Sequence, residues 1–118
     1  MNFNIPGLDV AAGLDLYDGD EKVYLLIIRT WFSDAPEYIS KLRNVSAETL
    51  KDYAVTVHGF KGASASIGAE DVRQAAKKLE MMAKAGDFAG VKAENESFLR
   101  QAESLVKDIQ NWLKQNNL

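Results

Sequence analysis

The chain has 118 residues, of which 47% are hydrophobic and 26% are charged, values typical of a single globular domain with a sizeable core. Its net charge is −3, and the sequence has no basic stripe of the kind that binds nucleic acid. The chain has no cysteine, which excludes disulfides and thiolate metal sites. The longest apolar run, Val23 to Ile28, is far shorter than the roughly 20 residues of a membrane span. Because the first residues also lack the features of a signal peptide, we expect a cytoplasmic protein with one domain over residues 1–118, no nucleic-acid partner and no membrane insertion.

The first two expected elements are a short helix and a long one. Asp9 can cap a brief helix over residues 9–17. The turn at residues 18–20 then precedes a long helix over residues 21–43, in which apolar residues recur at spacings of three and four. Pro36 predicts a break or kink within this helix. The acidic residues near this turn lack the ligand spacing of a calcium loop, so no metal site is predicted.

Three further helices follow in the second half of the chain. Ser46 predicts the start of a helix over residues 47–67, and Gly68 predicts its end. A helix over residues 69–85 and a last one over residues 88–115 are separated by Gly86 and Asp87. No stretch reads as a strand and the turns are short. The expected fold class is therefore all-α, an antiparallel four-helix bundle with the short N-terminal helix as a capping lid.

The only histidine, His58, lies within the helix over residues 47–67. The apolar stripe of that helix consists of Leu50, Tyr53, Val57, Phe60, Ser64 and Ile67. At roughly 100° per residue, His58 is displaced from the centre of this stripe onto the exposed shoulder. Lys61 stands about one turn further on, and Gly62 leaves the approach to the ring free of side chains, although a helical glycine costs about 0.5–1 kcal/mol relative to alanine. A nucleophilic imidazole, a nearby cation and an open approach together describe a phosphoryl acceptor.

The same stretch resembles a known signature. The run His58-Gly59-Phe60-Lys61-Gly62-Ala63-Ser64-Ala65-Ser66-Ile67-Gly68-Ala69 is similar to the H-x-x-K-G-x-x-x-x-[LI]-G-A motif of histidine-containing phosphotransfer (HPt) domains. Gly7-Leu8-Asp9, Gly19-Asp20-Glu21 and Leu79-Glu80 also fall where that family has similar residues, so the resemblance covers roughly the whole chain. HPt domains carry phosphoryl groups between receiver-domain aspartates. Gly59-Phe60 departs from the Thr-Leu that is frequent there, and the pattern offers no functional reason for Gly59.

The resemblance implies a phosphocarrier in a two-component multistep phosphorelay, and not an enzyme. His58 would accept a phosphoryl group on its ε nitrogen from a receiver aspartate and pass it to another receiver, while Lys61 would offset the charge of that group. The expected partners are receiver domains of response regulators or hybrid histidine kinases, which would supply the catalytic aspartate and the metal; no cofactor is expected in this chain. The predicted docking patch comprises Gly62, Ala54, Ala65 and Val55, with Leu14 of the short helix nearby.

Two other functions remain open. A helical module that docks on receivers without transferring phosphate would keep the bundle, but it would not need the histidine. A hydrolase with His58 as general base would need a partner carboxylate and a pocket, for which the sequence gives no convincing pattern. Structural roles are favoured for the remaining candidates. We expect a solvated face for Lys77, Lys78 and Lys84, core or end-cap packing for Trp31 and Trp112, core packing for Met81 and Met82, and packing with local hydrogen bonds for Ser64 and Ser66.

Overall fold

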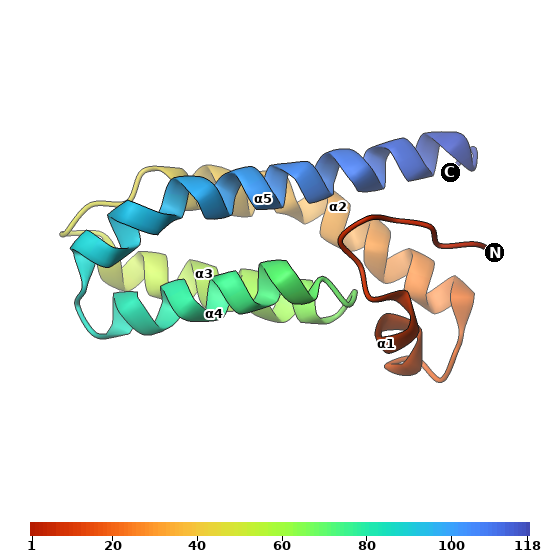
Figure 1. Ribbon diagram of the computed structural model, residues 1–118, viewed down its shortest axis with the longest axis horizontal. Helices are drawn as coiled ribbons and strands as arrows, with labels where there is room; N and C mark the ends of the chain where they lie inside the picture. The colour runs from red at the N-terminus through yellow and green to blue at the C-terminus, as the bar shows by residue number, and fades with distance from the viewer.

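The computed structural model describes residues 1–118 and contains five α-helices and no strand (Figure 1). The long helices α2 (Glu21–Arg43), α3 (Leu50–Ala65), α4 (Glu70–Lys84) and α5 (Phe88–Gln115) form an antiparallel four-helix bundle. Helices α2 and α4 each pack against both α3 and α5. In Figure 1, α2 and α5 extend past the α3–α4 pair, and the short α1 (Val10–Asp15) lies at that end beside the turn that joins α3 to α4. The predicted all-α fold is thus confirmed.

The inner faces of the helices form one hydrophobic core of 27 buried residues. The whole stripe predicted for α3, from Leu50 to Ile67, is buried. The N-terminal lead-in also contributes, because Phe3 is buried and its ring stacks on that of Trp112 with centroids 5.2 Å apart. Burial of a large apolar side chain stabilises the fold by about 1.5–3 kcal/mol. None of the five helices combines the length and hydropathy that a membrane crossing needs.

The start of α3 differs from the expectation, and the structure refines the expected effect of Pro36 on α2. Ser46 does not cap α3: the helix begins at Leu50, after a turn in which the backbone N–H of Ser46 donates to the Thr49 hydroxyl at 2.9 Å. Both residues are good N-cap types, so the sequence alone does not choose between them. Pro36 lies inside α2 without ending it, and the helix continues to Arg43.

The turn after α3 is closed by Gly68 and clamped by the N-terminal segment. Gly68 has φ of 75°, a left-handed conformation that glycine adopts without steric cost. Its carbonyl accepts a hydrogen bond from the backbone N–H of Asp9 at 2.8 Å. The hydroxyls of Tyr17 and Tyr24 donate to the two preceding carbonyls, those of Ser66 and Ile67, at 2.6 and 2.7 Å. These bonds satisfy the carbonyls of the turn that follows α3 and tie the segments on both sides of α1 to that turn.

Polar groups inside the bundle are paired. Asn95 of α5 accepts a hydrogen bond from the Tyr53 hydroxyl at 2.6 Å and donates one to the carbonyl of Leu42 at 2.9 Å, which ties three helices together. The Trp31 indole N–H donates to the Ser64 hydroxyl at 3.1 Å, so Ser64 has a packing role, as expected. No buried side-chain nitrogen or oxygen lacks a partner.

Gly59 has a structural explanation that the sequence pattern does not reveal. A Cβ atom at this position would lie 3.2 Å from the hydroxyl of Tyr38, a tighter approach than side chains normally tolerate. The Tyr38 ring in turn packs on Phe60, with centroids 5.0 Å apart. Gly59 therefore makes room for an α2 aromatic side chain against α3.

Candidate functional site

His58 lies on the outer surface of α3, on the side next to α4. Its side chain is 63% exposed, as the helical spacing predicts. Val57 and Phe60, which belong to the apolar stripe of the same helix, are fully buried. Because these side chains fix the rotation of α3 about its own axis, core packing holds the imidazole outside the bundle.

The ring is held by a carboxylate from the neighbouring helix. The Nδ1 atom of His58 lies 2.7 Å from Oε2 of Glu80, whose side chain is only 4% exposed. No role at the site was predicted for Glu80. A signal was nevertheless present, because Glu80 follows Ala76 by four residues and so falls on the face that α4 buries. A carboxylate in such a position requires partners, since an unpaired buried charge is strongly unfavourable.

Two lysines also bind this carboxylate. Nζ of Lys61 lies 2.6 Å from Oε1, and Nζ of Lys84 lies 2.8 Å from Oε2. Burial alone would raise the pKa of Glu80, but the hydrogen bonds from the two lysines and the imidazole outweigh it and lower the pKa to about 2. Glu80 is therefore an anion at neutral pH, and three donors surround it.

The charge of Glu80 determines which ring nitrogen of His58 is free. An ionised carboxylate only accepts hydrogen bonds, so Nδ1 carries the proton and donates it to Glu80. The lone pair of the neutral imidazole is then on Nε2. Because the two nitrogens lie on different edges of the ring, Nε2 faces away from Glu80. The arrangement presents a nucleophilic nitrogen to an approaching molecule.

The residues predicted to surround the ring differ in accessibility. A Cβ atom on Gly62 would meet no atom within 4 Å, so the space above it is open. Val55 is 74% exposed and Ala65 is half-buried. Ala54 is only 8% exposed and belongs to the core, because it lies next to Tyr53 on the edge of the buried stripe. Leu14 packs against the core from α1. Ala54 therefore offers little surface to a partner, whereas Leu14 is partly exposed.

The outer face of α4 also differs in part from the expectation. Lys84 is 64% exposed, but its ammonium group is bound to Glu80 rather than simply solvated. Lys77 is exposed and forms no ion pair. Met81, predicted in the core, is instead 63% exposed, because it follows Leu79 by two residues and so lies on the other side of the helix.

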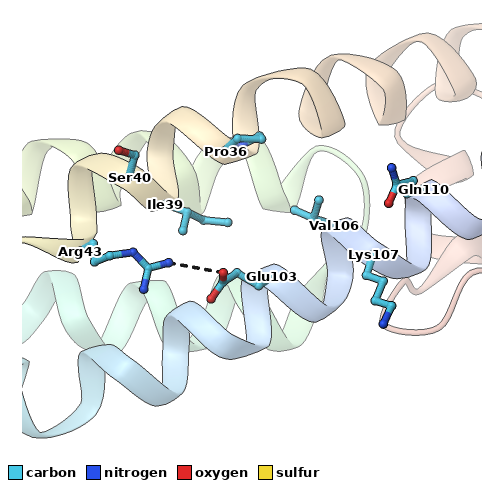
Figure 2. Close-up of a pocket in the computed structure, with 8 residues that line it drawn as sticks. All are labelled: Pro36, Ile39, Ser40, Arg43, Glu103, Val106, Lys107 and Gln110. Atoms are coloured by element: carbon cyan, nitrogen blue, oxygen red, sulfur yellow. Dashed lines mark ion pairs between the residues drawn. The ribbon is translucent and has the colours of Figure 1, made fainter.

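A groove on the surface lies away from His58. It has a volume of about 530 Å³ and runs between α2 and α5, where Arg43 and Glu103 form an ion pair at 3.4 Å (Figure 2). None of its lining residues comes from α3 or α4. Phosphoryl exchange between proteins needs a reachable nucleophile rather than an enclosed cavity, so the exposed ring is the better candidate site. No cluster of three or more acidic or histidine side chains is placed to hold a metal ion.

The structure is thus a four-helix bundle with one exposed imidazole, which a buried carboxylate orients and two lysines flank. A family model described as "Hpt domain" matches residues 27–115, which is most of the chain. The chain therefore belongs to the Hpt domain family, and the resemblance seen in the motif is confirmed. Members of this family carry phosphoryl groups in phosphorelays and are not enzymes. A search of curated proteins and a search of solved structures each found no match.

Proposed function

We propose that His58 is the phosphorylated residue of this Hpt domain. It would accept a phosphoryl group from the aspartyl phosphate of one receiver domain and pass it to the aspartate of another. The observation that carries this proposal is the 2.7 Å contact between Nδ1 and Glu80, which leaves Nε2 free on an exposed ring. The chain contains no other histidine that could take this role.

In the proposed step, the Nε2 lone pair attacks the phosphorus atom of the aspartyl phosphate. The N–P bond forms while the bond from phosphorus to the aspartate oxygen breaks, and the aspartate leaves as a carboxylate. The imidazole keeps its Nδ1 proton and becomes positively charged. Glu80, at 2.7 Å, stabilises this charge as it develops. The reverse sequence of bond changes returns the phosphoryl group to a receiver.

Lys61 would offset the negative charge of the phosphoryl group. It lies on α3 about one turn from His58, and its side chain is 26% exposed. Two unit charges ~4 Å apart interact by roughly 1–4 kcal/mol between bulk water and a surface-like dielectric. This energy favours the phosphorylated state but is too small to drive transfer, so the aspartate and the metal that activate the group would belong to the receiver. We propose that the receiver docks over Val55, Gly62 and Ala65.

Incubation with a phosphorylated receiver domain tests the proposal. The wild-type chain should acquire an acid-labile, alkali-stable phosphoryl group, and a His58→Gln variant with unchanged helical circular dichroism should acquire none. Labelling of the His58→Gln variant would contradict the assignment. Receiver binding that is indifferent to magnesium and yields no phosphohistidine would favour the alternative, a docking module that transfers nothing.

A further inference from the structure

Glu80 has more cations around it than its charge requires. Lys61 occupies Oε1, while Lys84 shares Oε2 with the Nδ1 proton of His58. Neither lysine is within ion-pair distance of another carboxylate. One of the two ammonium groups is therefore surplus to the neutralisation of Glu80 in the unphosphorylated protein.

The position of Lys61 raises a problem for its role at the phosphoryl group. Glu80 lies at the Nδ1 edge of the ring, whereas the phosphoryl group would be attached to Nε2 on another edge. Lys61 is bound to Glu80 at 2.6 Å, so it has to loosen this contact before it can pair with the phosphoryl group. If Lys84 were absent, this departure would leave the 4% exposed carboxylate with the Nδ1 edge of the imidazole as its single partner, which is unfavourable for a buried charge.

We propose that Lys84 is the positioning residue that permits Lys61 to change partners. This inference rests on the proposed phosphorylation of His58. Lys84 lies four residues after Glu80 on the same helix, so its ion pair does not depend on α3 or on the phosphorylation state. It binds the same oxygen as Nδ1 and keeps Glu80 ionised and aimed at the ring. Lys61 then moves to the phosphoryl group while the buried charge stays paired.

The test uses phosphoramidate, a small-molecule phosphoryl donor, to phosphorylate His58 without a partner protein. Wild type is compared with Lys84→Met, Lys84→Arg and a matched control, Lys77→Met. Lys77 is an exposed lysine of α4 about one turn before Glu80 that forms no ion pair. The readouts are the NMR shift of the Lys61 ammonium group before and after phosphorylation, and the rate at which phosphohistidine hydrolyses. Helical circular dichroism verifies that each variant is folded.

We expect the Lys61 ammonium signal of wild type and of Lys77→Met to shift when His58 is phosphorylated. In Lys84→Met the signal should stay near its unphosphorylated position, because Lys61 is now the only lysine that pairs with Glu80. Its phosphohistidine should hydrolyse about tenfold faster, a factor that corresponds to about 1.4 kcal/mol. Lys84→Arg should restore both properties, since it retains the charge and reaches the same oxygen.

An equal Lys61 shift in Lys84→Met and wild type would overturn the inference, as would a hydrolysis rate that matches Lys77→Met. A merely structural role of Lys84 would lower stability and leave the Lys61 response intact. If wild-type His58 takes up no phosphoryl group from phosphoramidate or from a phosphorylated receiver, the proposed function itself fails and the inference falls with it. The two failures are therefore distinguishable.

Discussion

Replacing Glu80 by glutamine would remove the charge that three donors share while keeping the shape of the side chain. The carboxyl is 4% exposed, and its pKa falls from 4.5 to about 2 on folding. Since one pKa unit corresponds to about 1.36 kcal/mol, a fall of this size sets an upper limit of about 3 kcal/mol on its contribution to folding. Two of the three donors are mostly exposed, and solvent screening reduces the expected loss in the Glu80→Gln variant to about 1–2 kcal/mol.

This contribution should depend on pH in one direction only. The pKa of Glu80 is lower in the folded chain than in the unfolded one, so the unfolded chain binds more protons in acid. The stabilisation is therefore complete above the unfolded value of 4.5 and is lost as the pH falls towards about 2. Glutamine does not titrate. The stability deficit of Glu80→Gln relative to wild type should thus be largest at neutral pH and vanish at the acidic end of this window.

Urea unfolding, followed by the fluorescence of the buried Trp31 and Trp112, measures the free energy of unfolding at both ends of the window. Glu70→Gln is the matched control. A hydrogen bond from Arg73 is the main cause that lowers the pKa of Glu70 to about 2 as well, but this pair is exposed, so its loss should affect stability little. Equal deficits of Glu80→Gln at neutral and acidic pH, or no deficit at neutral pH, would refute the reasoning.

Four further substitutions, at three positions, test the site and the turn that closes it. Gly62→Ala should raise the free energy of unfolding by about 0.5–1 kcal/mol, because the added methyl group meets no atom within 4 Å and alanine favours a helix; a lower urea midpoint would contradict this. Gly62→Leu should slow transfer from a phosphorylated receiver but not labelling by phosphoramidate, and an unchanged receiver rate would remove clearance as the role of Gly62. Lys61→Ala should slow transfer with an intact circular dichroism spectrum, whereas equal rates would exclude Lys61 from the mechanism. Gly68→Ala should cost about 1–2 kcal/mol for the left-handed backbone alone, and more because its Cβ would collide with the backbone oxygen of Asp9; an unchanged melting temperature would argue against this account.

The helices whose ends depend on local signals are those that the sequence describes best. α2 and α5 cover the expected residues 21–43 and 88–115, and the side chains of Asp20 and Asp87 accept hydrogen bonds from backbone N–H groups in the first turn of these helices. α3 covers residues 50–65 instead of 47–67, because two competing cap residues precede it and a tight turn follows it. Local chemistry identifies a cap, but only the surrounding structure selects between two adjacent ones.

His58 and Glu80 likewise differ in whether local sequence signals predict their place in the site. The exposure of His58 follows from its angle to the apolar stripe of its own helix, which is a local property. The role of Glu80 depends on a contact across 22 positions in the chain and on the rotation of α4 against α3. The apolar spacing of α4 marks its buried face, yet it does not say which residue of α3 a glutamate on that face will meet.

The close packing of α3 against α4 connects the fold to the chemistry of the ring. Ala76 and Ala83 are buried on α4 about one turn on either side of Glu80. The distance between packed helices depends on the side chains at their contact, and small residues give the shorter distances. At this spacing, Glu80 on the buried face of α4 reaches the exposed imidazole of His58 on α3 at 2.7 Å. Larger side chains at these two positions would separate the helices and break this contact while much of the core persists, so the small residues of α4 help to hold Glu80 within reach of the ring.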